Sequence, residues 1–187
     1  IKQGDVEAEA MYDELLDLMY TYNELGTGVN AYVIDTGIRT THQDFGGRAI
    51  LGTDCSVIDG SGNCVGDGTD GLGHGTSVAS ILGGSTYGAA KNVTIYNVRV
   101  CEADGDCFNS NWIAAMDWVT SNHVKPAVVN QSLGTVGGPA GAIDKAARRS
   151  IAAGVTHVVC AKNSNTDASS VSPARVTQAI TVGATGN

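Results

Sequence analysis

Several groups that could take part in acyl transfer follow short β-branched runs of this sequence. Asp35 ends the run VNAYVID, Ser132–Gly134 end the run AVVNQSLG, and Asn163 comes just after VTHVVC. His74 lies between two glycines in GHGT, and glycine allows another backbone to approach closely. An acid, a base, an extended backbone edge and an amide donor are the components of an acyl-transfer site other than its nucleophile.

Ordinary structural roles are the alternative for most of these residues. Aspartate or asparagine after a strand commonly makes a turn, so Asp35 and Asn163 are weak signals when taken alone. The other three histidines have no predicted role in catalysis. His42 lies in a polar turn and His123 at a helix end. His157 falls inside an apolar strand, where we expect a core histidine with its hydrogen bonds satisfied.

The alternation of strand-like and helix-like segments predicts an α/β fold, with a parallel β-sheet flanked by helices. The predicted strands cover residues 29–35, 93–100, 127–132, 155–160 and 179–184. The predicted helices are His74–Gly83, Asn109–Asn122 and Pro139–Gly154. Residues 54–73 are rich in Gly and Asp and are predicted to form a long surface loop. Ligands bind beyond the carboxyl ends of the strands in such a sheet, which is where the candidate groups lie.

Composition and charge narrow the classes of function. The chain has 187 residues, 42% of them hydrophobic, which is enough for one globular domain, and we place it at residues 28–187. A formal net charge of -8 disfavours binding to nucleic acid or to anionic lipid. No apolar run approaches the roughly 20 residues of a membrane-spanning helix, so we expect no membrane partner. The start IKQGDVEAEA lacks the basic and then apolar pattern of a signal peptide, and we expect a chain that has already been processed by cleavage.

Residues 1–27 are predicted to form an acidic amphipathic N-terminal helix or arm. Asp5–Glu24 hold seven acidic and no basic side chains, and their apolar residues recur at steps of three and four. The apolar stripe could pack on the domain itself or on a partner protein. We expect it to pack on its own domain.

The five cysteines predict two local disulfides and one free thiol. Cys55 with Cys64, and Cys101 with Cys107, each bracket a short polar loop. Such bridges would form in an oxidising compartment and favour secretion, whereas four reduced surface thiols are the alternative. Cys160 ends an apolar run and is expected to be a buried, unreactive thiol.

Beyond these patterns, the sequence resembles the subtilisin-like serine proteases, in their proteinase K and aqualysin branch. The resemblance runs from about residue 28 to residue 184 and rests on the following segments, in this order: AYVIDTGIRTTHQDF, GLGHGTSVAS, GGSTYGAAKNVTIYNVRV, AAMDWVTSNHVKPAVVNQSLGT, IAAGVTHVV and SPARVTQAITVGAT. It implies a secreted endopeptidase that acts on peptides or proteins.

The resemblance also implies roles for individual residues. Asp35 would orient the imidazole ring, His74 would be the general base and Asn163 would donate to the oxyanion. The strand Ser132, Leu133, Gly134 would pair with the substrate backbone. Lys162 stands where the family has a glycine that lines the specificity pocket, so we expect it to obstruct an apolar substrate side chain.

The sequence also departs from the pattern of the family it resembles. The family's nucleophile lies in a GTSMA-type segment at the start of a later helix, and the 187 residues reach no such segment and contain no GxSxG motif. We therefore expect this chain alone to be inactive, with a missing C-terminal segment as a partner. Ser77 stands where a second histidine is usual, and Gly71 and Ser169 stand where the branch has cysteines.

Calcium is the family's common ion, so the loop carboxylates are candidate ligands. These are Asp59, Asp67, Asp70, Asp104 and Asp106. None of them completes an EF-hand pattern, and solvated loop acids are the simpler interpretation. The carbonyls of Thr177 and Ala179 fall at a further family site, whose aspartate would lie beyond residue 187. We expect no required cofactor, with calcium as an optional structural ion.

Three functions are consistent with the sequence. The first is a subtilisin-like serine endopeptidase, of which this chain holds the Asp and the His but not the Ser. The second is a catalytically inactive fragment of the same fold that acts as a binding or structural module. The third is an esterase that uses the same strand ends.

Overall fold

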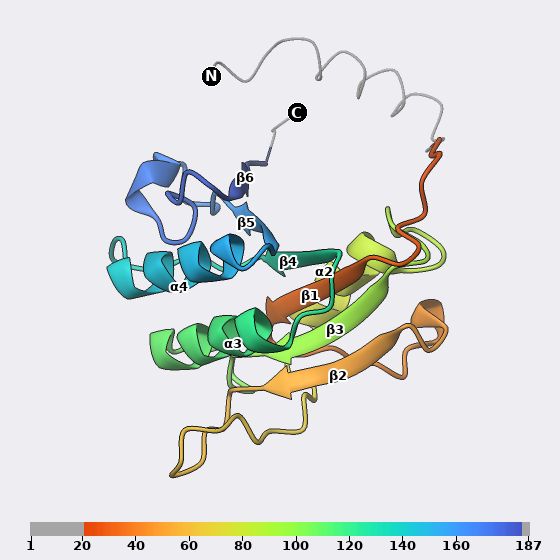
Figure 1. Ribbon diagram of the computed structural model, residues 1–187, viewed down its shortest axis with the longest axis horizontal. Helices are drawn as coiled ribbons and strands as arrows, with labels where there is room; N and C mark the ends of the chain where they lie inside the picture. Colours follow the sequence, from red (N-terminus) through yellow and green to blue (C-terminus); the bar gives the residue numbers. More distant parts are fainter. Residues whose placement is uncertain (1–20, 185–187) are drawn as a thin grey trace.

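A parallel sheet of six strands organises residues 21–184, which are the residues that the computed structural model describes (Figure 1). The strands are β1 (Asn30–Asp35), β2 (Ala49–Asp54), β3 (Thr94–Arg99), β4 (Ala127–Gln131), β5 (Thr156–Cys160) and β6 (Ile180–Val182). Their order across the sheet is β2-β3-β1-β4-β5-β6, and all neighbours are parallel. The predicted fold class, a parallel β-sheet flanked by helices, is confirmed.

Three α-helices and two short 3-10 helices connect the strands in the described part of the chain. They are α2 (His74–Gly83), α3 (Asn109–Asn122), α4 (Gly141–Ala152), η1 (Gln43–Phe45) and η2 (Ala168–Ser170). The predicted bounds of α2 and α3 are confirmed. The prediction that the third helix begins at Pro139 is wrong, because Ala140 is extended and its N–H donates to Ser172 Oγ. The helix does stop before Gly154, whose φ of 97° no helix allows.

Strand β2 is absent from the predictions, and Asp54 is its last residue rather than the first residue of the loop. β2 lies at the edge of the sheet, where Ile50 and Leu51 are 41% and 51% exposed, so its sequence shows no alternation of buried and exposed residues. Its pairing with β3 also shifts register between Leu51 and Thr53, at Gly52. A strand with these two features has no clear pattern in the sequence.

Helices α3 and α4 pack side by side on one face of the sheet, and α2 packs on the other (Figure 1). The larger apolar core lies under α3 and α4 and includes Trp112, Met116 and Ile143. The smaller core lies between α2 and the sheet and includes Val33 and Phe45. Alternate residues of β1 therefore face different cores, as the two-residue period of a strand requires.

The face that holds α2 is covered only over β1 and β3 in the described part of the chain. Further along this face, Val158 and Cys160 of β5 pair with Ile180 and Val182 of β6. Paired residues of parallel strands point to the same side of the sheet. Ile180 and Val182 are 55% and 51% exposed. We call this surface of β5 and β6 the open face.

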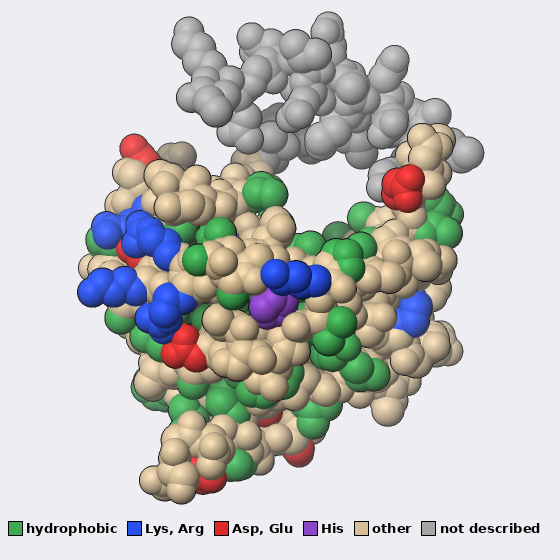
Figure 2. Space-filling model, viewed as in Figure 1, with side chains coloured by type: hydrophobic (Ala, Val, Ile, Leu, Met, Phe, Trp, Pro, Cys, Tyr) green, Lys and Arg blue, Asp and Glu red, His purple; other side chains and the backbone are tan. Residues whose placement is uncertain are grey.

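The opposite surface of the molecule is the one that α3 and α4 cover. Figure 2 shows it, with lysine and arginine side chains gathered where α4 lies. Lys145, Arg148 and Arg149 are the exposed bases of this helix. Arg149 donates to Asp117 of α3 at 2.6 Å, an ion pair that links the two helices. No helix within residues 21–184 is long and apolar enough to cross a membrane.

Both predicted disulfides are present, between Cys55 and Cys64 and between Cys101 and Cys107. Cys160 is free, as predicted. The prediction that its thiol is buried is wrong, because the side chain of Cys160 lies on the open face and is partly exposed. Of the predicted acidic helix, the part up to residue 20 lies outside the described residues. Residues 21–24 are described and are not helical.

Candidate active site

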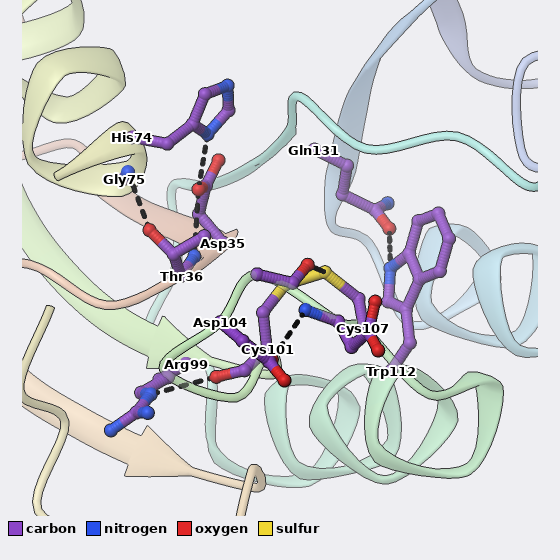
Figure 3. Close-up of a disulfide and its surroundings, with 12 residues drawn as sticks. Asp35, Thr36, His74, Gly75, Arg99, Cys101, Asp104, Cys107, Trp112 and Gln131 are labelled. Carbon is purple, nitrogen blue, oxygen red and sulfur yellow. Dashed lines mark hydrogen bonds and ion pairs between the residues drawn. A yellow bond between two sulfur atoms is a disulfide. The ribbon is translucent and has the colours of Figure 1, made fainter. Parts of the chain in front are cut away.

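Asp35 lies at the carboxyl end of β1, fully buried beneath α2. Its Oδ1 accepts two hydrogen bonds, one from the Thr36 N–H at 2.7 Å and one from His74 Nδ1 at 2.6 Å (Figure 3). Its Oδ2 is buried and has no partner among the described residues. Burial raises the pKa of Asp35 above its usual value, and the hydrogen bonds from His74 and Thr36 oppose that rise.

His74 is the first residue of α2, and its side chain is 47% exposed. Because the Asp35 carboxylate accepts from Nδ1, this bond places the ring proton on Nδ1 and leaves a lone pair on Nε2. In Figure 3 the far edge of the ring points away from Asp35. The Asp35–His74 pair, called the dyad below, can therefore accept a proton from a group that approaches Nε2.

A second carboxylate, that of Asp70, holds the start of α2 in place. Helix α2 has no capping side chain at residue 73, which is a glycine. Asp70 Oδ1 accepts instead from Gly73 N–H at 2.8 Å and from Thr36 Oγ1 at 2.9 Å, and Oδ2 accepts from Thr76. Burial by itself would raise the pKa of Asp70, but the bonds from Thr76, Gly73 and Thr36 outweigh it and hold the pKa low.

Thr36 links this anchor to the dyad. Its hydroxyl donates to Asp70. The same hydroxyl accepts from the Gly75 N–H at 2.9 Å, and the Thr36 N–H donates to Asp35 (Figure 3). Gly75 packs so closely that a Cβ there would collide with the Gly37 carbonyl oxygen. From the sequence, Asp70 was predicted only as a candidate calcium ligand. An aspartate a few residues before a helix start was the signal for its capping role.

Ser132, Leu133 and Gly134 follow β4 and are partly exposed. Val33 of β1 is opposite Asn130 of β4, which places Asp35 and Ser132 at the same level of neighbouring strands. Strand β5 is the next neighbour of β4, so residues after its end are about 10 Å from the end of β1, at about 4.8 Å per strand. The extended segment thus runs between the dyad and the loop that follows β5.

Lys162 and Asn163 follow β5 and line a cavity of about 320 Å³ together with Ser132 and Cys160. The Lys162 ammonium donates to the Thr135 carbonyl oxygen at 2.8 Å. Its side chain thus lies across the extended segment. The topology therefore places all the predicted site residues at one edge of the sheet, with Asp35 and His74 in direct contact.

Ser77, at the position where a second histidine was expected by resemblance, donates its hydroxyl to the Gly73 carbonyl at 2.9 Å. It also lines a cavity of about 670 Å³ between α2 and the segment that contains His42 and Asp44. No pattern in the sequence predicts this cavity. Six of its nine lining residues carry a hydroxyl group.

Three buried side chains form a series of hydrogen bonds between the sheet and α3. Trp112 Nε1 donates to Gln131 Oε1, and Gln131 Nε2 donates to His157 Nδ1 at 2.9 Å. His157 is buried, as predicted, but its Nε2 has no partner among the described residues, so the expectation of a fully satisfied histidine is wrong. Burial lowers the pKa of His157 from 6.5 to about 4.

Calcium binding remains a prediction. Residues 21–184 contain no group of three or more His, Cys, Asp or Glu side chains that could hold a metal ion. The carboxylates of Asp59 and Asp67 accept hydrogen bonds from backbone N–H groups of their own loops, which lower the pKa of each. These carboxylates are therefore already used in shaping the loops.

The sequence matches a known protein family and several characterised relatives. The Subtilase family matches residues 26–187. The chain is 55% identical over 170 residues to an "Extracellular serine proteinase" of Thermus sp. (strain Rt41A), a match that covers 91% of this chain and 40% of the relative. It is 48% identical over 174 residues to "Proteinase T" of Parengyodontium album, covering 89% of this chain and 56% of that protein.

A solved structure has a similar fold. It is the crystal structure of "a cold adapted subtilisin-like serine proteinase", with a TM-score of 0.82 and 46% sequence identity over 90% of this chain and 59% of that one. The chain thus spans 40% to 59% of the length of these relatives.

Proposed function

The chain belongs to the subtilase family, and we propose that it is the Asp- and His-bearing part of a secreted serine endopeptidase. The dyad is the observation on which this proposal rests: a buried carboxylate 2.6 Å from the Nδ1 of an exposed imidazole, at the carboxyl edge of a parallel sheet. The name of the Thermus relative and the two disulfides support secretion.

Each predicted residue then has one task in peptide-bond hydrolysis. His74 Nε2 accepts the proton of a serine hydroxyl as that oxygen attacks the substrate carbonyl, and later delivers the proton to the leaving amine. Asp35 keeps the ring oriented and stabilises the imidazolium. The side-chain amide of Asn163 donates to the oxyanion. Ser132, Leu133 and Gly134 pair with the substrate backbone.

We place the nucleophilic serine on a segment outside these 187 residues. The open face supports this proposal, because it exposes Ile180 and Val182 next to the cavity that Asn163 lines. A helix with an apolar stripe would bury these side chains and bring its own first turn to the same edge of the sheet. The 187-residue chain alone should therefore have no serine that the dyad can activate.

The direct test joins this chain to the part of the Thermus proteinase that follows the matched region. The joined protein should hydrolyse succinyl-Ala-Ala-Pro-Phe-p-nitroanilide, and His74→Ala should abolish that activity. His123→Ala is the matched control, because His123 lies at the end of α3, before β4 begins. Activity that survives His74→Ala would contradict the proposed role of the dyad.

Asn163→Leu should lower kcat about 10²- to 10³-fold, the loss known for the oxyanion asparagine of subtilisin itself. Asn122→Leu at the exposed end of α3 is its control. The 187-residue chain alone should not react with a phosphonate probe for activated serines. Labelling of any serine in it would favour a different site, and a completed protein that binds peptides without cleaving them would favour the binding module.

A further inference from the structure

Lys162 has a backbone conformation that is unusual for its residue type. Its φ is 75°, in the left-handed region, where a Cβ costs roughly 1 kcal/mol. Within residues 21–184 the only other non-glycine residue with positive φ is Asn165, and asparagine tolerates this region. A lysine held in this conformation beside a candidate substrate strand indicates a functional role for its side chain.

The side chain of Lys162 is held in place by two contacts. Its stem packs against Gly134, where an added Cβ would lie 3.1 Å from Lys162 Cγ. Its ammonium donates to the Thr135 carbonyl oxygen at 2.8 Å. The stem therefore crosses the extended segment and reduces the room there, while the ammonium is fixed at Thr135, directly after that segment.

The Lys162 ammonium has no carboxylate partner in the described part of the chain. None of the ion pairs among residues 21–184 includes it, although the whole sequence has 19 acidic and 11 basic side chains. An ammonium has three N–H donors, and the Thr135 carbonyl uses one. A partly buried cation with free donors attracts a carboxylate more strongly than it does in water.

We propose that the space beside the Lys162 ammonium receives an acidic side chain, Glu or Asp, of a peptide that lies along Ser132–Gly134. The inference rests on the proposed function and adds a substrate class to it: the acidic residue is the one before the cleaved bond. Lys162 acts as the specificity-determining residue, since its ammonium pairs with the carboxylate while its stem excludes large apolar side chains. No bond is made or broken in this recognition.

The test measures binding and does not depend on catalysis. Acetyl-Ala-Ala-Pro-Glu-amide and its Gln counterpart are titrated into the ¹⁵N-labelled 187-residue chain, and the amide signals of Ser132–Gly134 and Asn163 are followed by NMR. The Glu peptide should bind roughly 3- to 10-fold more tightly than the Gln peptide, as expected for a partly exposed ion pair. The preference should shrink in 0.5 M NaCl.

Variants of Lys162 assign the preference to its charge. Lys162→Met keeps most of the stem and should abolish the difference between the peptides, whereas Lys162→Arg should retain it. Lys125→Met, at an exposed lysine just before β4, is the matched control and should leave the preference intact. Equal binding of the two peptides, or a preference that survives Lys162→Met, would overturn the inference.

Other outcomes separate this inference from the proposed function. If no peptide shifts the Ser132–Gly134 signals, both the acidic pocket and the proposed substrate strand are wrong. If the peptides bind with the Glu preference but the completed protein fails to hydrolyse an Ala-Ala-Pro-Glu anilide, the pocket stands and the proposed catalysis fails. If it hydrolyses the Phe anilide at least as fast as the Glu anilide, catalysis stands and the acidic specificity fails.

Discussion

Acid should destabilise this protein through one buried imidazole, that of His157. Its ring is 1% exposed, and Nδ1 accepts from the Gln131 amide, so a proton added at Nδ1 would face another donor. Nε2 has no hydrogen-bond partner among the described residues. Burial lowers the pKa of His157 from 6.5 to about 4. The unfolded chain therefore binds more protons than the folded chain between these two values. The stabilisation from a neutral His157 is complete above pH 6.5 and is lost as the pH falls toward 4.

The size of this effect follows from the two pKa values. Lowering a pKa from 6.5 to about 4 corresponds to about 3 kcal/mol of unfolding free energy, at 1.4 kcal/mol for each tenfold change. A domain of this size is stable by about 5–15 kcal/mol, so the loss is a large share of the total. Urea unfolding followed by tryptophan fluorescence, at intervals between pH 4 and pH 7.5, measures it directly.

The variant His157→Asn isolates this contribution, because the amide oxygen of asparagine can replace Nδ1 as the acceptor from Gln131 but does not titrate. The free-energy difference between wild type and variant should grow by about 3 kcal/mol from pH 4 to pH 7. His42→Asn is the control, since the Nδ1 of His42 also accepts an N–H but its ring is partly exposed. A difference that does not change with pH, or an equal change in the control, would refute the reasoning.

Three further perturbations test the rest of the structure. Gly75→Ala should separate Asp35 from His74, because the new Cβ would collide with the Gly37 carbonyl oxygen. The low-field NMR signal of the His74 Nδ1 proton should then disappear, and its persistence would contradict the close approach of Gly75 to Gly37. Asp70→Ala should lower stability by about 1–3 kcal/mol and broaden that signal, and an unchanged melting temperature would contradict its capping role. Removing the Cys101–Cys107 bridge by double serine substitution should cost about 2 kcal/mol in urea unfolding, given its short loop, and a neutral effect would show that the bridge does not constrain the unfolded chain.

The elements that the sequence predicted well have strong local signals. Both ends of α2 and of α3 were predicted to the residue. Gly154 was predicted to stop the third helix, and α4 ends two residues before it. The two disulfides follow from cysteines six and nine residues apart, which short loops bring together. Asp35 and His74 were predicted to meet because one ends a strand and the other starts a helix at the same edge of a parallel sheet.

The features that were missed depend on neighbours far along the chain. Strand β2 is a register-shifted edge strand, which leaves no alternation to detect. The exposure of Cys160 depends on which face of β5 has a helix over it, and its apolar sequence context is the same in either case. His157 has a hydrogen bond at only one ring nitrogen, because Gln131, 26 residues away, reaches Nδ1 and no described residue reaches Nε2.

The sequence by itself determined the fold class, the edge of the sheet at which the candidate groups gather and the identities of those groups. Periodicity, capping residues and the ends of β-branched runs act over a few residues, so they can be read along the chain. Only the tertiary structure decided that Asp70 anchors the dyad, that the Lys162 ammonium reaches the Thr135 carbonyl, and that one face of β5 and β6 is open. Hydrogen-bond partners and burial come from strands and loops that meet in space, and no local pattern in the sequence specifies which atoms will meet.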